Sequence, residues 1–228
     1  MVDQSIKVAV DAVVFGYSNN ELKILLIQQK YGETKDQWAL PGGFVKDSEG
    51  LDEAVKRELC EETGVKATYL EQLYTFGNPK RDSRFRVVSI AYIALINPKN
   101  SQLEASTDAK DAQWFDVKSL PKLAYDHQTI ISVGLERLKA KINYQPIGFD
   151  LLATYFPFSD LENLYQTILD KKIDRRNFRK KILSFNILEE TDKISQAGSG
   201  RPAKLFKFNL TNYKRLEKQG FHFEIKLV

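Results

Sequence analysis

The sequence predicts an α/β domain followed by a smaller domain of two helices and a β-hairpin. In the first half, runs rich in β-branched and apolar residues alternate with helical patterns. In the second half, two amphipathic segments precede two strand-like runs. Residues 1–150 carry 19 Lys+Arg and 21 Asp+Glu, whereas residues 151–228 carry 15 and 9. This asymmetry predicts an acidic module joined to a basic module that prefers a polyanion.

The composition limits the chemistry that is available. The 228 residues are 43% hydrophobic and 28% charged, which is close to the average for globular proteins. The single cysteine, Cys60, and only two histidines, His127 and His222, exclude a disulfide framework and a metal centre rich in Cys or His. No apolar run reaches the roughly 18 residues of a membrane span, and the N-terminus lacks the pattern of a secretory signal. We therefore expect a cytoplasmic protein without membrane contact, whose chemistry comes from carboxylates, Lys and Arg.

The first domain is predicted from its hydrophobic pattern. Strands are expected at residues 8–15, 22–28, 67–76, 85–95 and 112–117. Pro41-Gly42-Gly43 predicts a loop. A helix is expected from about Gly50 to Thr63, with Gly64 ending it, because its apolar residues recur at spacings of three and four. Asp126 is a candidate cap for a later helix that runs through Leu138.

The second domain follows an interruption by Pro and Gly at residues 143–150. The boundary is placed there, giving domains 1–145 and 146–228. Ser159 and Glu162 have the spacing of a capping box, before an amphipathic helix over residues 161–169. Asp174 is expected to cap a second helix, with an inner side formed by Phe178, Ile182 and Leu183. Strands at 185–191 and 204–209, with a Gly- and Ser-rich tip between them, complete the order of a winged helix-turn-helix.

The helix over residues 50–63 ends with a cluster of carboxylates. Glu58, Glu61 and Glu62 follow Arg57 and lie three and four residues apart, so they are expected on one side of the helix. Like charges at this spacing repel one another, and a bound divalent cation removes the conflict. Such an ion assists attack on a phosphoanhydride. The alternative for this pattern alone is a solvated acidic face paired with Arg57.

A longer motif favours the metal site over the solvated acidic face. The segment resembles the Nudix box, G-x5-E-x7-R-E-U-x-E-E-x-G-U with U aliphatic. The matching residues are Gly43, Glu49, Arg57, Glu58, Leu59, Glu61, Glu62, Gly64 and Val65. The resemblance implies a Nudix α/β/α sandwich. It also implies Mg²⁺ or Mn²⁺ held directly by Glu58 and Glu62, with Glu61 as a further ligand or a partner through water, while Arg57 and Glu49 hold the box in shape.

The resemblance extends beyond the box. Residues 38–43, which end in Gly43, and the loop at 76–82 look like those of the branch that includes ADP-ribose pyrophosphatases. In and after this loop, basic side chains are candidates to bind a pyrophosphate: Lys80, Arg81, Arg84 and Arg86. An ordinary basic turn is an equally good interpretation. The general base is left open among Glu104, Asp108 and Asp111.

The predicted second helix of the second domain is strongly basic. Residues 171–181 carry seven Lys or Arg side chains and one acid, Asp174. The second helix of a helix-turn-helix enters the major groove of DNA, where Lys and Arg hold phosphates and Arg or Asn can read bases. The candidate DNA-binding residues are Lys172, Arg175, Arg176, Asn177, Arg179 and Lys180, with Arg201 in the wing. The alternative is a basic, solvated helix in an accessory domain.

The combination of domains resembles the Nudix-related transcriptional regulators. That resemblance implies a Nudix domain that senses a small molecule, such as an ADP-ribose-like nucleotide or a sugar, and a homodimer on a double-stranded operator that controls NAD metabolism or sugar utilisation. Many members have an eroded box, whereas this box is complete, so hydrolysis stays open. The two hypotheses are therefore an effector-responsive regulator, and a Mg²⁺-dependent Nudix hydrolase with an accessory domain.

Overall fold

The chain divides into two compact units, Met1–Arg137 and Leu138–Val228. The computed structural model describes residues 5–101, 103, 109–195, 202–220 and 223–225. The division falls within a long helix, α2 (His127–Tyr144). The functional boundary that we expect between residues 145 and 146 stays a prediction. No helix of the described part is long and apolar enough to cross a membrane.

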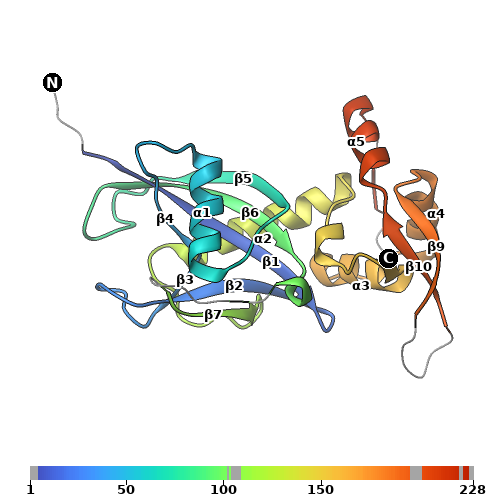
Figure 1. The fold of residues 1–228 in the computed structure, drawn as a ribbon, viewed down its shortest axis with the longest axis horizontal. Helices are drawn as coiled ribbons and strands as arrows, with labels where there is room; N and C mark the ends of the chain where they lie inside the picture. The colour runs from blue at the N-terminus through green and yellow to red at the C-terminus, as the bar shows by residue number, and fades with distance from the viewer. Residues whose placement is uncertain (1–4, 102, 104–108, 196–201, 221–222, 226–228) are drawn as a thin grey trace. The chain divides into compact units, whose positions relative to one another are not determined.

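The first unit is built on a mixed sheet (Figure 1). Its strands are β1 (Lys7–Ser18), β2 (Glu21–Gln29), β3 (Trp38–Ala39), β4 (Gly42–Phe44), β5 (Tyr69–Phe76), β6 (Val87–Ile96) and β7 (Ala109–Asp116). The order is β3-β2-β1-β6-β5, with β4 paired to β1 and β7 paired to β2. Only β1 and β6 pair in parallel among these strands. The five predicted strands are all present within a few residues of the expected ends.

The segment Pro41-Gly42-Gly43, predicted as a loop, contributes to a short strand instead. Gly42 pairs with Asp11 and Gly43 with Val10, so β4 lies along β1. A Cβ atom on Gly42 would meet the carbonyl oxygen of Val10, and only glycine permits this approach. Turn-forming residues therefore enter the sheet here because their backbones fit against β1. Their place beside β1 also brings them to the end of the box helix.

Two helices cover the two faces of this sheet (Figure 1). Helix α1 (Leu51–Thr63) packs Ala54, Val55 and Leu59 into a buried cluster with side chains of β1, β2 and β6. It ends at Gly64, whose φ of 71° is left-handed, as the sequence predicts. On the other face, Gly134 of α2 lies against Val13. A short 3₁₀ helix, η1 (Pro98–Asn100), follows β6.

The second unit has the predicted order of two helices and a hairpin. Its elements are η2 (Phe149–Leu151), β8 (Phe156–Pro157), α3 (Phe158–Leu169), α4 (Arg175–Ser184), β9 (Leu188–Ile194), β10 (Lys204–Phe208) and α5 (Leu210–Gln219). The small sheet has the order β8-β10-β9. The prediction from sequence omitted α5. The hairpin tip at residues 196–201 lies outside the described residues.

Aromatic side chains hold this unit together. Tyr165 of α3 lies 4.7 Å from Phe178 of α4 between ring centroids, and Phe158 lies 5.8 Å from Phe206 of β10. The rings of Phe149 and Phe208 stack at 4.0 Å. Burial of such rings dominates the stability of a small core. The core therefore fixes α4 against α3 and β10 from its inner side.

Two local predictions for these helices are wrong. Ser159 does not cap α3, because the helix already begins at Phe158 with Pro157 in the N-cap position. Phe158 is buried between aromatic rings, which draws the first turn inward. Leu183 was expected on the inner side of α4, but it is 37% exposed. The cap at Asp174 is confirmed, since its carboxylate accepts from the Asn177 N–H at 3.0 Å.

Candidate functional site

Arg57 organises the box at the centre of α1. Its guanidinium forms a fork with Glu49, with Nε–Oε2 at 2.8 Å and Nη2–Oε1 at 2.5 Å. It also donates to the backbone carbonyl of Phe44 at 3.2 Å. Hydrogen bonds from Arg57 and from the Lys46 N–H lower the pKa of Glu49 to about 2. Arg57 thus connects the loop before α1 with the helix.

Glu58 lies close to the backbone of β4. Its carboxylate accepts from Arg57 Nη1 at 2.7 Å. A Cβ atom on Gly43 would collide with this carboxylate, so the glycine lets Glu58 approach the strand. Burial raises the pKa of Glu58, assisted by the negative charges of Glu61 and Glu49, while Arg57 opposes the shift. Burial and neighbouring acids destabilise the ionised form of a carboxylate, and a bound cation would stabilise it.

Glu62 and Glu61 take up different positions. Glu62 is 8% exposed, and its carboxylate accepts from the Gly42 N–H at 2.8 Å. Glu61 is 55% exposed at its side chain and lies 3.1 Å from Arg57 Nη1. The expected convergence is not met, since no three His, Cys, Asp or Glu side chains of the described residues are grouped to hold a metal ion. Arg57 draws Glu58 and Glu61 to itself, whereas the β4 backbone holds Glu62.

The donor set nevertheless fits a hard divalent cation. Glu58 and Glu62 both lie against Gly42-Gly43 of β4, one through the space left by Gly43 and the other through a backbone hydrogen bond. Carboxylate oxygens are the ligands that Mg²⁺ and Mn²⁺ prefer, together with water and phosphate oxygens. The metal ligands Glu58, Glu61 and Glu62 stay a prediction.

A pocket of about 360 Å³ lies in the first unit. It is lined by Thr34, Asn78, Lys80, Arg81, Ser83, Tyr125 and Asp126. Two of the predicted substrate-binding residues, Lys80 and Arg81, are therefore on its wall. Lys80 is exposed, so its ammonium is available to an anionic ligand.

Arg81 itself is committed to acidic partners. Its side chain is 6% exposed and pairs with Asp126 at 2.8 Å and with Asp11 at 3.1 Å. Ser89 donates to the same Asp11 carboxylate at 2.5 Å. His127 Nε2 lies 3.5 Å from Asp11 Oδ1, and burial lowers the pKa of His127. The guanidinium is thus a structural part of the pocket wall, and its role in binding pyrophosphate stays a prediction.

The remaining candidates of the first unit are not among the residues that line the pocket, although Arg84 donates to the hydroxyl of the lining residue Tyr125 at 3.2 Å. Arg84 forms a fork with Asp82 at 3.0 and 2.8 Å. Arg86 donates to the carbonyl of Val87 at 3.2 Å. Asp111, a candidate general base, accepts from the Ala112 N–H and from Gln113 Nε2. The other two candidates, Glu104 and Asp108, lie outside the described residues.

The side chains that surround Arg81 beside the pocket were not predicted as a group. Asp11 is in β1, Arg81 is in the loop before β6, and Asp126 precedes α2. These positions are far apart in the chain and meet only in the folded unit, where β1 lies beside β6. The alternation of β1 carries no signal for this, because nearly every residue of the strand is buried. The network therefore depends on the tertiary fold of the unit.

The basic face of α4 is open to solvent. Arg175, Arg176, Arg179 and Lys180 of α4 are all exposed, and so is Lys172, which precedes the helix. Arg201 lies outside the described residues. An exposed row of Lys and Arg on the second helix of a helix-turn-helix is suited to DNA phosphates.

Contacts with neighbouring side chains orient some of these residues. Arg175 Nε lies 3.7 Å from Glu162 of α3, and burial raises the pKa of Glu162 although Arg175 and Arg179 oppose the shift. The Arg179 guanidinium lies 4.5 Å from the ring centroid of Phe158. The Asn177 side chain donates to Asp174 at 2.5 Å. Contact of Asn177 with adenine stays a prediction, since this amide is already paired with the cap.

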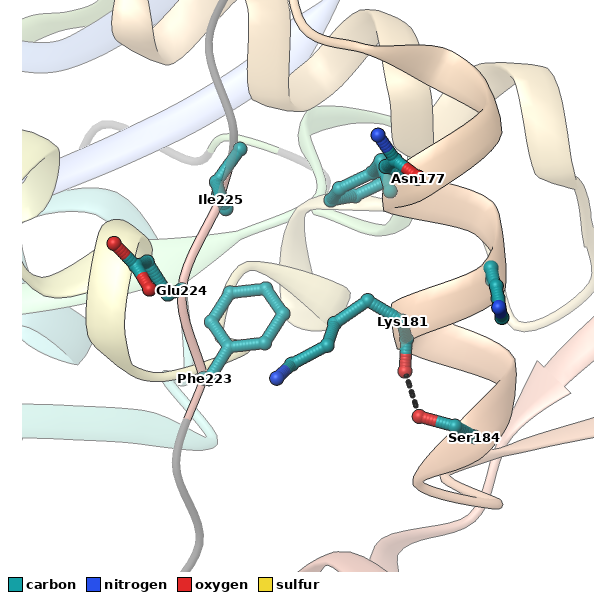
Figure 2. Close-up of a pocket in the computed structure, with 8 residues that line it drawn as sticks. Asn177, Lys181, Ser184, Phe223, Glu224 and Ile225 are labelled. Carbon is teal, nitrogen blue, oxygen red and sulfur yellow. Dashed lines mark hydrogen bonds between the residues drawn. The ribbon is translucent and has the colours of Figure 1, made fainter.

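A second pocket, of about 270 Å³, lies between α4 and a segment near the C-terminus. Figure 2 shows Phe223 and Ile225 opposite Asn177 and Lys181, with the Lys181 side chain extended toward Phe223. Phe223 is 2% exposed and lies 5.9 Å from Phe185 between ring centroids. The segment thus covers one flank of α4, while Arg176 and Lys180 remain exposed.

These features define the class of the protein. A mixed sheet with a carboxylate-rich helix after a Gly-Gly strand is a Nudix domain, and the second unit is a winged helix domain. The NUDIX domain family matches residues 6–133, and the family described as the NrtR DNA-binding winged helix domain matches residues 148–208. The chain therefore belongs to the Nudix family, and its second domain is a winged helix domain of the NrtR type.

Known relatives match most of the chain or about half of it. The chain is 36% identical over 208 residues to the ADPR responsive transcriptional repressor NtrR of Acinetobacter baylyi, covering 90% of this chain and 82% of the relative. An ADP-ribose pyrophosphatase of Methanocaldococcus jannaschii is 44% identical over 124 residues, which cover 54% of this chain and 70% of that enzyme.

Crystal structures extend the likeness to the fold. NrtR of Shewanella oneidensis in complex with a 27mer DNA superposes with a TM-score of 0.83 at 30% identity, over 97% of this chain and 99% of that one. Its isolated NUDIX domain in complex with ADP ribose gives a TM-score of 0.56 at 36% identity, over 60% of this chain and 90% of that one. The fold predicted from the sequence is thus confirmed across both units.

Proposed function

We propose that this protein is an ADP-ribose-responsive transcriptional repressor. The observation that carries the proposal is the presence, in one chain, of a Nudix domain with a pocket beside Lys80 and a winged helix domain whose α4 exposes a row of basic side chains. Its relatives include a repressor named for its response to ADPR and a structure with DNA. The Nudix domain binds the nucleotide, and α4 binds an operator in the major groove.

Charge reversal in α4 tests the DNA-binding half of the proposal. Arg175→Glu combined with Arg179→Glu replaces two cations on the exposed face and should abolish salt-sensitive binding to duplex DNA. Lys110→Glu in β7 is a matched control, because it reverses an exposed charge of the Nudix domain. The assignment of α4 to DNA binding is wrong if the double variant and the control both bind the duplex as tightly as wild type does.

Calorimetry with ADP-ribose tests the sensing half. We expect saturable binding by the full chain, and a change of at least about fivefold in DNA affinity when the nucleotide is present, which is the usual size of an allosteric coupling. We also propose that the protein binds its operator as a homodimer, which sedimentation with and without DNA measures directly. Binding of ADP-ribose without any change in DNA affinity would contradict the regulatory role.

A second function, hydrolysis of ADP-ribose, is favoured by the complete box. We infer that Glu58 and Glu62 would hold Mg²⁺ or Mn²⁺, with Glu61 as a further ligand. The ion would supply charge neutralisation of the diphosphate and a more acidic water. The chain's own contribution is the fixed geometry: Arg57 and Glu49 brace α1, and the Gly42 N–H orients Glu62. The products from ADP-ribose would be AMP and ribose 5-phosphate.

A further inference from the structure

The carboxyl end of α4 is held by a residue outside the region that matches the winged helix family, 148–208. Asn212 Nδ2 of α5 donates to the carbonyl oxygens of Phe185 and Asn186 at 2.9 and 2.8 Å. The last turn of a helix leaves carbonyl groups without a helical partner, and these two belong to that turn and the residue after it. The Asn209 N–H donates to the next carbonyl, that of Ile187, at 2.8 Å. The start of α5 is therefore bonded to the exit of α4.

Helix α5 is held to its neighbours by polar and aromatic contacts. None of its residues, Leu210–Gln219, is buried. Asn209 caps its amino end by accepting from the Asn212 N–H at 2.8 Å, and the Tyr213 ring lies 5.4 Å from that of Phe208. A helix of this length is marginal by itself in water. Its polar contacts with neighbouring segments thus determine where it lies.

Gln145 supplies a further contact, from the residue directly after α2. Its Nε2 donates to the Tyr213 hydroxyl at 2.7 Å and to Glu217 Oε1 at 2.8 Å. Its own N–H continues the α2 pattern by donating to the Lys141 carbonyl at 2.8 Å. Gln145 therefore fixes α5 on one face, while Asn212 fixes it to the end of α4.

We propose that Asn212 and Gln145 are positioning residues for the DNA-reading helix. The inference rests on the proposed function, in which α4 reads the operator. Base edges are read through short, directional hydrogen bonds, whereas phosphates attract cations over a wide range of positions. A shift of α4 caused by loss of α5 contacts weakens the reading of bases and leaves the attraction to phosphates nearly intact.

The experiment compares two duplexes bound by the full chain. One is selected by the wild-type protein from a randomised library, and the other is a scrambled duplex of the same composition. Asn212→Ala and Gln145→Ala are each expected to lower affinity for the selected duplex about tenfold, the cost of roughly one lost base contact. Affinity for the scrambled duplex and the slope of affinity with salt should not change. Gln219→Ala is the matched control, an exposed Gln of α5, and should bind as wild type does.

A purely structural role would give a different pattern. A loss of folded protein lowers the active fraction, which a stoichiometric titration measures, but leaves the ratio of the two affinities unchanged. Asn212→Asp places a carboxylate against the two carbonyl oxygens and should lower the ratio further than Asn212→Ala. An unchanged ratio in Asn212→Ala and Gln145→Ala, or a salt slope reduced as for a lost phosphate contact, overturns the inference. Failure of the wild type to select any duplex would instead overturn the proposed function.

Discussion

His127 Nδ1 accepts a hydrogen bond from the backbone N–H of Leu40 at 2.8 Å. This bond requires Nδ1 to be unprotonated, so the ring is neutral with its proton on Nε2, toward Asp11. Burial lowers the pKa of His127 and Arg81 adds to the shift, while Asp11 and Asp126 oppose it. His127, the first residue of α2, is thus bonded to Leu40 between β3 and β4, and protonation of the ring would break this bond.

Stability should consequently fall on acidification. In the unfolded chain His127 takes up a proton near its ordinary pKa of 6.5, whereas the folded protein takes it up only at lower pH. Below 6.5 the unfolded state binds more protons, so the free energy of unfolding decreases until the folded pKa is passed, by about 1.4 kcal/mol for each unit between the two values. Above pH 6.5 His127 is neutral in both states, so it adds no pH dependence to the free energy of unfolding.

Urea unfolding between about pH 8 and about pH 5 measures this loss, with His127→Gln as the comparison. Glutamine keeps an oxygen that can accept from the Leu40 N–H but does not titrate. The variant should therefore lose less stability than wild type over this interval. If the free energy of unfolding falls equally with pH in the two proteins, His127 is not the source of the pH dependence.

Arg57→Lys should weaken the box without removing its charge. Lysine cannot form the fork with Glu49 or reach the Phe44 carbonyl at the same time. We expect a loss of about 2 kcal/mol in the free energy of unfolding, which is typical for hydrogen bonds to charged groups. The pKa of Glu49 should rise from about 2 toward its ordinary 4.5, as NMR titration measures. Lys56→Arg, on the exposed side of α1, serves as the control and should leave both quantities unchanged.

Glu62→Gln should separate sensing from hydrolysis. The amide oxygen of glutamine can still accept from the Gly42 N–H, but the charge needed to hold a divalent ion is gone. Since changes even to the partners of metal ligands cost about 10–100-fold, Mg²⁺-dependent release of AMP from ADP-ribose should fall at least about 100-fold. Glu53→Gln on the same helix keeps its bond to the Gly50 N–H and should retain activity. Equal turnover by Glu62→Gln and wild type would exclude Glu62 from the catalytic site.

The sequence predicted what depends on neighbouring residues. The box helix and its cap at Gly64 were predicted because their signals lie within one segment. The network of Asp11, Arg81 and Asp126 was not predicted, because its members are far apart in the chain and meet only in the folded unit. Helix α5 was missed for a different reason: it is short and none of its residues is buried, so no core residue marks it in the sequence.

The expected capping box shows how packing overrides a local motif. The spacing of Ser159 and Glu162 favours Ser159 as the N-cap, but with Phe158 buried in the first turn the N-cap is Pro157, two residues earlier. The Glu162 carboxylate then lies near Arg175 of α4. Neither the ring packing nor this ion pair can be derived from the spacing of two residues in one helix.

Phe223→Ala should destabilise the second unit through its core. The ring is 2% exposed and lies 6.4 Å from Tyr165 and 5.9 Å from Phe185 between centroids, so its removal leaves a cavity beside α4. Truncation of a buried phenylalanine costs about 3–5 kcal/mol. Amides of α4 should then exchange hydrogen faster, while those of β1 and β6 in the first unit keep their protection, because the two units are compact by themselves. Leu210→Ala removes a side chain that is 52% exposed and should change α4 exchange little. Unchanged exchange in Phe223→Ala would mean that the ring is dispensable and that α4 is held from its inner side alone.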